Sequence, residues 1–163
     1  MGMAMRINLG SYIYPLSGYV NVDIERWDGV DVVYDLSKLP WPFDDGVAQH
    51  IRAVDILEHL GKLTKVEAVG ELARITRKGG TVEIRVPLCT NAISLQSLQH
   101  AHAFYIDSFQ NSYVQPWFEL ESRSISFFKG RLDVPFVTPL HHLMRVLCRL
   151  GFGYCITFQL RKL

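Results

Sequence analysis

The chain has 163 residues, of which 48% are hydrophobic and 20% are charged, the balance of an ordinary globular domain with its own core. Lys and Arg number 17 and Asp and Glu number 16, so the formal net charge is +1. This balance gives no support for a general nucleic-acid surface or a polybasic membrane contact. We therefore expect a single domain over residues 1–163 with no membrane partner.

The three cysteines are predicted to be reduced thiols. Cys89, Cys148 and Cys155 are odd in number and form no CxxC pair, which disfavours a disulfide framework and a cysteine-built zinc site. The first residues contain no apolar signal-peptide segment, and no apolar run approaches the roughly 20 residues that span a bilayer. These features predict a soluble, cytoplasmic protein.

The first half of the chain alternates short apolar segments with turn residues. Segments 5–9, 19–23, 30–34 and 50–54 are rich in apolar, β-branched or aromatic side chains and are predicted as strands. The two prolines in 40–42 exclude regular structure between the third and fourth of them.

The clearest predicted helix begins at Thr64. Glu67 follows three residues later, which is the spacing of a capping box, and apolar residues then recur at helical spacing. Segment 77–80 reads Arg-Lys-Gly-Gly, so we predict that the helix ends there. The alternating segment 81–86 is predicted as the next strand.

The second half gives weaker patterns. We predict partial helix over 95–113, one or two strands over 118–128, a helix over 139–150 and a closing strand over 154–160. Strands separated by helices predict an α/β sheet, and the continuously apolar early strands are typical of strands covered on both faces. The expected fold is a doubly wound, mostly parallel, Rossmann-like sheet.

Four strand ends stand out for their chemistry. In doubly wound sheets, ligands bind outside the carboxyl ends of the strands, where the strand order reverses. That rule selects four positions, three of them carboxylates: Gly10-Ser11, Asp23, Asp35 and Asp55. Carboxylates accept hydrogen bonds from ribose hydroxyls and an adenine amine, and glycine allows close backbone approach. The pattern favours a nucleoside cofactor, and the alternative is that these aspartates are ordinary turn or helix-cap residues.

Four segments carry a family resemblance. They read NLGS at 8–11 with GYVNVD at 18–23, DL at 35–36 with LPWPF at 39–43, DILEHL at 55–60, and ELARI at 71–75 with KGG at 78–80. In this order and spacing they resemble class I S-adenosylmethionine (SAM)-dependent methyltransferases of the broad type 11 group. The resemblance covers about half of the chain.

The resemblance implies a cofactor, its binding residues and one detail of the sheet. It implies SAM as the cofactor, with a pocket lined by Gly10, Ser11, Asp23, Asp35, Leu36 and Asp55. It also implies an antiparallel strand near the C-terminal end of the sheet, which segment 154–160 would supply. The activity it implies is methyl transfer to an acceptor, which we expect to be a small molecule, with a sugar-like compound as one option.

The chain departs from that group at its first loop. Tyr12 stands where many members have a second glycine, and only about eight residues separate Leu9 from Gly18, fewer than a helical parallel crossover needs. We therefore predict that the usual first helix is shortened or missing. The departure leaves open an alternative function, a catalytically inactive methyltransferase-like binding or assembly protein.

The catalytic candidates are Glu58 and His59, because they follow the fourth strand at the binding edge. Methyl transfer mainly requires positioning, and histidine is the usual base when the acceptor must lose a proton. The alternative is that His59 packs at a helix start. No HExxH or similar spacing is present, so we expect no metal site, and the absence of GxGxxG and of a Walker loop counts against a nucleotide-phosphate enzyme.

Overall fold

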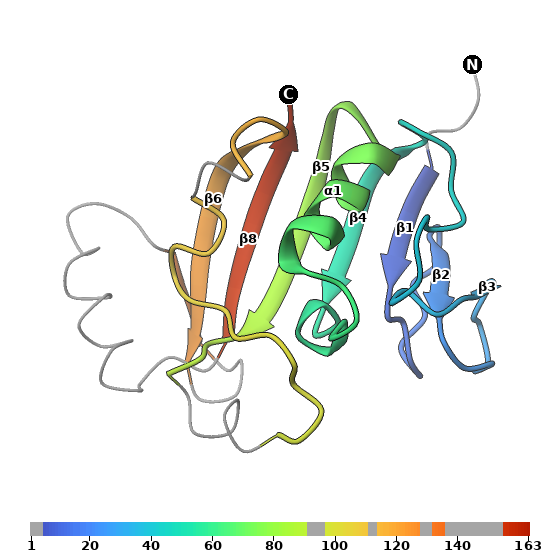
Figure 1. The fold of residues 1–163 in the computed structure, drawn as a ribbon, viewed down its shortest axis with the longest axis horizontal. Coiled ribbons are helices and arrows are strands. Elements are labelled where there is room, and N and C mark those ends of the chain that lie inside the picture. The colour runs from blue at the N-terminus through green and yellow to red at the C-terminus, as the bar shows by residue number, and fades with distance from the viewer. Residues whose placement is uncertain (1–4, 91–96, 111–113, 128–131, 136–154) are drawn as a thin grey trace.

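The computed structural model describes residues 5–90, 97–110, 114–127, 132–135 and 155–163. Within them, eight strands form one sheet in the order β3-β2-β1-β4-β5-β8-β6-β7 (Figure 1). The strands are β1 (Met5–Leu9), β2 (Val20–Asp23), β3 (Val32–Val33), β4 (Ala48–Val54), β5 (Thr76–Pro87), β6 (Phe118–Phe127), β7 (Leu132–Pro135) and β8 (Cys155–Lys162).

The sheet is mixed and mostly parallel. Strands β3, β2, β1, β4 and β5 pair in parallel with one another in this order. Strand β8 runs antiparallel between β5 and β6, and β7 is antiparallel to β6. This arrangement confirms the expected Rossmann-like sheet and its antiparallel strand near the C-terminus. The order reverses between β1 and β4, which places the switch point at their carboxyl ends.

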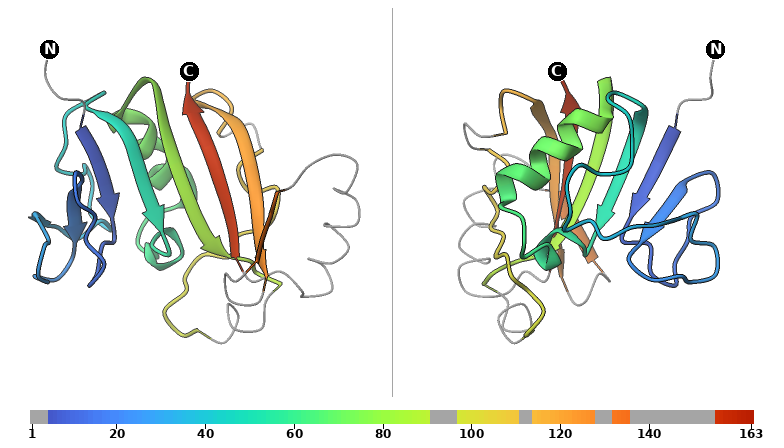
Figure 2. Two further views of the ribbon diagram at one scale, coloured as in Figure 1. Left: turned by 180° about the vertical axis from the view of Figure 1, so that it is seen from behind. Right: turned by 45° about the vertical axis from the view of Figure 1, so that its right-hand side comes forward.

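The described helices are few. Helix α1 (Lys65–Ile75) lies on one face of the sheet, over β4 and β5 (Figures 1 and 2). The predicted capping box is present, because Thr64 and Glu67 exchange side-chain and backbone hydrogen bonds. The 3₁₀ helix η1 (Leu57–His59) follows β4. No helix in the described part of the chain has the length and apolar character needed to cross a membrane.

The C-terminus of α1 was predicted wrongly. The helix ends at Ile75 rather than at Gly79-Gly80, because Thr76 is extended and pairs with Ala48 of β4. The two glycines instead lie within β5, next to a register shift in its pairing with β4, and Gly79 has a φ of 72°. A Cβ on Gly80 would lie 3.0 Å from the carbonyl oxygen of Ala48, so the close approach of two backbones requires glycine there.

Other predictions had mixed outcomes. The missing first helix is confirmed, because residues 10–19 contain turns and no helix. The strand predicted over 30–34 is only the two residues of β3. Segment 97–110, expected to be partly helical, contains turns and no helix. Its residues Phe104 and Phe109 are buried in the core with stacked rings, without a helix to carry them. The helix predicted over 139–150 lies outside the described residues.

Candidate functional site

Two cavities adjoin at the carboxyl edge of the sheet, the edge toward which β1, β2, β4 and β5 point in Figure 1. The first, of about 250 Å³, is called the acidic cavity and is lined by residues that include Gly10, Asp23, Asp35, Leu36, Ile56 and His59. The second, of about 560 Å³, is called the arginine cavity and is lined by residues that include Ser11, Tyr12, Arg52, Asp55, Arg85 and Gln99. Gly10 and His59 line both cavities, so the two are neighbours.

The turn after β1 forms the wall between them. Gly10 has a φ of 67°, and a Cβ there would lie 2.9 Å from the side chain of Ile56. Both the left-handed backbone and the close approach therefore require glycine. Ser11 is buried, and its Oγ has no hydrogen-bond partner within the described residues. A buried hydroxyl without a partner is unfavourable, so this atom is suited to meet a ligand.

Asp23 ends β2 and holds the preceding loop. Its Oδ2 accepts a hydrogen bond from the backbone N–H of Tyr12 at 2.8 Å, and its Oδ1 accepts one from the backbone N–H of Glu25 at 3.1 Å. A carboxylate has about four acceptor sites, so further acceptor capacity remains. The side chain is thus fixed in direction while it lines the acidic cavity.

Asp35 is fixed in a comparable way. It accepts hydrogen bonds from the backbone N–H of Ser37 at 3.0 Å and from the hydroxyl of the same residue. The Nζ atoms of Lys38 and Lys62 lie 3.9 and 4.0 Å from the Oδ2 of Asp35. The hydroxyl of Ser37 is the main reason that the pKa of Asp35 lies below its ordinary value. The group is therefore an anionic acceptor at neutral pH.

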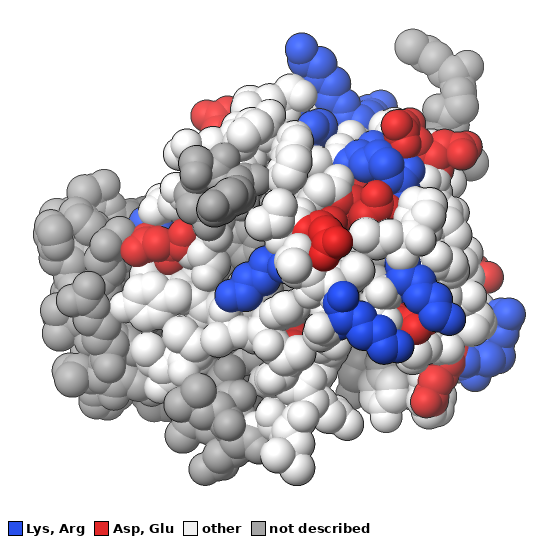
Figure 3. Space-filling model, viewed as in Figure 1, with Lys and Arg blue, Asp and Glu red and all other residues white. Residues whose placement is uncertain are grey.

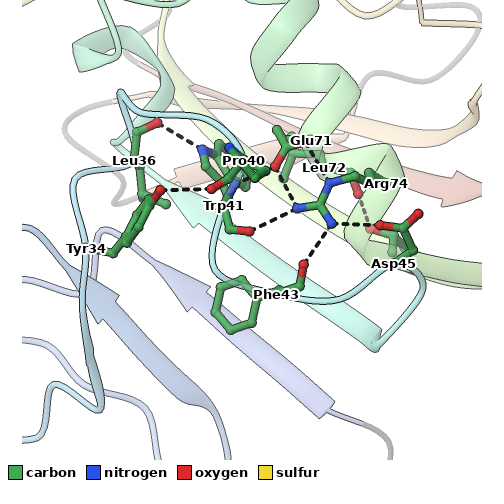
Figure 4. Close-up of polar contacts among 10 residues, drawn as sticks. Tyr34, Leu36, Pro40, Trp41, Phe43, Asp45, Glu71, Leu72 and Arg74 are labelled. Atoms are coloured by element: carbon green, nitrogen blue, oxygen red, sulfur yellow. Dashed lines mark hydrogen bonds and ion pairs between the residues drawn. The ribbon is translucent and has the colours of Figure 1, made fainter.

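The segment that carries Asp35 is attached to α1 by a partly buried network (Figure 4). Arg74 donates to the carbonyl oxygens of Trp41 at 3.0 Å and Phe43 at 2.7 Å, and Glu71 accepts from the backbone N–H of Trp41 at 2.7 Å. Glu71 and Arg74 also pair with each other at 2.7 Å. The indole of Trp41 is 1% exposed and donates to the carbonyl oxygen of Leu36 at 2.9 Å. This network was not predicted, although Glu71 and Arg74 lie three residues apart, a spacing at which opposite charges on a helix can pair.

The arginine cavity is built on two residues with strained backbones. Tyr12 has a φ of 46° and Asp55 a φ of 53°, a region that residues other than glycine rarely adopt. The Tyr12 ring lies edge-on to Trp27 at 5.0 Å and is half exposed, so it borders the cavity without filling it. Asp55 forms an ion pair with Arg85. This predicted cofactor residue is therefore engaged by a cation from β5.

The catalytic candidates lie in η1. Glu58 is 1% exposed, its Oε2 has no hydrogen-bond partner in the described part of the chain, and burial raises its pKa to about 7. It is not among the residues that line either cavity. His59 lines both cavities, and its Nδ1 lies 3.2 Å from the carbonyl oxygen of Gln99. Burial lowers the pKa of His59, which favours the neutral imidazole at pH 7.

One neighbour of these residues was not among the predicted site residues. His100 lies beside His59, with 4.9 Å between the ring centroids. His102 is placed differently, because its Nε2 lies 2.8 Å from the carbonyl oxygen of Leu63 and 3.1 Å from that of Leu60. The sequence gives no signal for this separation, because the partial helix predicted over 95–113 is absent from residues 97–110 and an irregular segment has no regular face.

Comparisons with known proteins identify solved structures with a similar fold. No family model matches the chain, and no curated protein sequence matches it. Among solved structures, a SAM-dependent methyltransferase from Thermotoga maritima, described as a possible histamine N-methyltransferase, aligns with a TM-score of 0.70 at 16% identity, covering 100% of this chain and 84% of that one.

Two further structures agree. A putative sarcosine dimethylglycine methyltransferase from Galdieria sulphuraria aligns with a TM-score of 0.66 at 12% identity, covering 97% of this chain and 78% of that one. A SAM-dependent methyltransferase from Archaeoglobus fulgidus aligns with a TM-score of 0.64 at 14% identity, covering 99% and 87%. At these identities the likeness establishes architecture, not activity. The chain has the Rossmann-like fold that these SAM-dependent methyltransferases share.

Proposed function

We propose that the protein binds SAM and transfers its methyl group to a small-molecule acceptor. The observation that carries the proposal is the acidic cavity at the switch point, where Gly10, Asp23 and Asp35 converge from three consecutive strand ends. Nucleoside recognition needs close backbone approach, fixed carboxylate acceptors and apolar cover, and Leu36 supplies the last of these.

The residues fit the cofactor in parts. Asp23 and Asp35 are suited to the ribose hydroxyls and the adenine amine. Because Gly10 lines both cavities, a cofactor with its adenosine in the acidic cavity would extend past this glycine into the arginine cavity. There Ser11 has a buried hydroxyl without a partner among the described residues, and Asp55, paired with Arg85, contributes a carboxylate near the sulfonium end.

SAM, when bound, supplies a methyl group on a cationic sulfur, which makes that carbon electrophilic. His59 lies where the two cavities meet, and its lowered pKa keeps the imidazole neutral. It can therefore accept the proton that an acceptor oxygen or nitrogen loses. The carbonyl oxygen of Gln99 orients the ring through Nδ1.

A small acceptor is favoured over a nucleic acid by the charge distribution. On the face drawn in Figure 3, basic and acidic side chains of the described residues are interspersed. With a formal net charge of +1, the chain has little of the positive field that nucleic-acid binding requires.

Thermal unfolding with added SAM or S-adenosylhomocysteine tests the proposal, because a ligand that binds only the folded state raises Tm. We expect Asp35→Asn to weaken the binding about 10-fold or more, since a hydrogen bond to a charged group contributes about 1.5–3 kcal/mol. Asp44→Asn, a change at an exposed carboxylate on the same connecting segment, is the matched control. The absence of a shift at millimolar concentrations of either compound would contradict the proposal.

Tyr12 supports a second candidate function, that of a methyltransferase-like binding protein without activity. Its side chain borders the arginine cavity at the position of the second glycine. Binding of SAM to Tyr12→Gly, but not to the wild-type protein, would favour this second function.

A further inference from the structure

Three potential metal ligands meet beside the junction of the two cavities. Glu58, His59 and His100 each offer one ligand atom, and these atoms lie within 4.8 Å of one another. Two of the residues come from η1 and the third from segment 97–110. The backbone N–H groups of Ala101 and His102 hold the two segments together, because both donate to the carbonyl oxygen of Glu58, at 2.8 and 3.1 Å.

Among the described residues, the carboxylate of this cluster forms no direct ion pair, and the cation that acts on it, Arg85, is paired with Asp55. Glu58 is 1% exposed, and its Oε2 has no hydrogen-bond partner in the described part of the chain. A proton or a cation beside the unpaired oxygen would lower the cost of burying this carboxylate.

The first histidine is oriented as a metal ligand would be. The Nδ1 of His59 lies 3.2 Å from the carbonyl oxygen of Gln99, an acceptor, so Nδ1 carries the proton and Nε2 keeps its lone pair. Metal-ligating histidines almost always have this kind of outer partner, which fixes the ring and its tautomer. His102 differs, because its Nε2 is already engaged with two carbonyl oxygens.

We propose that Glu58, His59 and His100 bind one divalent first-row transition ion, such as Zn²⁺ or Co²⁺. Two imidazoles and one carboxylate suit these ions, whereas Mg²⁺ and Ca²⁺ prefer oxygen ligands alone. Zn–N and Zn–O bonds are about 2.0–2.2 Å, so the ligand atoms must draw together by roughly 1–2 Å, a change within reach of side-chain rotation. Three protein ligands leave coordination positions open, and His59 places them beside both cavities. A metal on Nε2 would occupy the lone pair proposed above to accept a proton, so the metal-bound state and the base role of His59 exclude each other.

Titration of metal-free protein with Co²⁺ and then Zn²⁺, without SAM, tests the site. We expect one equivalent of Co²⁺ to give visible absorption bands that Zn²⁺ abolishes. Since loss of an outer partner alone lowers metal affinity 10–100-fold, His100→Ala should weaken Zn²⁺ binding about 100-fold or more. Glu58→Gln should do the same while it keeps the fold, because it removes only a buried charge.

The control is His50→Asn, on β4, whose Nδ1 lies 2.8 Å from the hydroxyl of Thr81. This variant should bind Zn²⁺ like the wild-type protein. No Zn²⁺ binding by the wild-type protein would overturn the proposal, as would equal affinities of the wild-type, His100→Ala and Glu58→Gln proteins. Because no SAM is present, failure here leaves the proposed methyltransferase function untouched.

Discussion

The two cavities at the carboxyl edge are built on opposite principles. In the acidic cavity, Asp23 and Asp35 are held by hydrogen bonds from neighbouring backbone, and the segment behind them is fixed to α1. In the arginine cavity, Tyr12 and Asp55 adopt left-handed backbones. A site that binds one cofactor gains from preorganised groups. Strained residues, by contrast, persist where the surrounding structure holds them and are concentrated at functional sites. The comparison teaches that the side proposed for the adenosine is rigid by construction, whereas the side proposed for the amino-acid part of the cofactor is held under backbone strain.

The largest effect should come from breaking the network behind the acidic cavity. Arg74→Ala leaves Glu71, 11% exposed at its side chain, without its cation, and removes the donors to Trp41 and Phe43. We expect a loss of about 3 kcal/mol in the free energy of unfolding, measured by urea denaturation. Arg77→Ala, at an exposed arginine just beyond α1, should change it by less than about 0.5 kcal/mol. Equal effects of the two substitutions would show that the network does not stabilise the fold.

A substitution at the wall between the cavities should have the next largest effect. Gly10→Ala adds the cost of a left-handed alanine to a 2.9 Å clash with Ile56, about 2 kcal/mol in total. Gly18→Ala is the matched control, because Gly18 also has a positive φ, of 78°, but has no atom within 4 Å of the added Cβ. Its cost should be about 1 kcal/mol. The contact has no role if the two variants unfold at the same denaturant concentration.

Strain on the arginine side can be measured with a pair of variants. Tyr12→Gly and Tyr12→Ala lose the same contact with Trp27, but only glycine relieves the φ of 46°. Tyr12→Gly should therefore be more stable than Tyr12→Ala by about 1 kcal/mol in chemical denaturation. A more stable alanine variant would mean that the backbone at this position is not strained.

The smallest expected effect is a pH dependence of the network. The hydrogen bond from Arg74 is the main cause that lowers the pKa of Glu71 below its ordinary value of 4.5. Since the folded pKa is lower than the unfolded one, this pairing stabilises the fold above about pH 4.5, and the stabilisation is lost as the pH falls further. The stability gap between the wild-type protein and Arg74→Met should therefore shrink from pH 7 to pH 3.5, by an amount on the order of 1 kcal/mol. A gap that is constant over this range would argue against the pairing.

The sequence was most informative where the determinants are local. Asp23 and Asp35 could be placed at one edge because strand patterns and turn residues around them are short-range signals. The start of α1 was predictable from the capping box of Thr64 and Glu67. Its end was not, because Gly79-Gly80 belongs to β5 near a register shift with β4, and strand pairing cannot be read from the local sequence.

Long-range contacts through irregular segments were beyond prediction. Gln99 lies 40 residues from His59 in the chain, and the partial helix predicted over its segment is absent from residues 97–110, so the contact could not be inferred from periodicity. For the same reason, the spacing of the histidines gave no indication that His100 would meet Glu58. The ion pair between Asp55 and Arg85 likewise depends on the register of β4 and β5.

A crystal structure of the protein soaked with S-adenosylhomocysteine tests the central claim most directly. The account predicts the adenosine in the acidic cavity, with Asp23 and Asp35 as hydrogen-bond acceptors and Leu36 against the base. It also predicts that the amino-acid part passes Gly10 into the arginine cavity. A ligand bound elsewhere, or in the reverse orientation, or no ligand at saturating concentration, would contradict it.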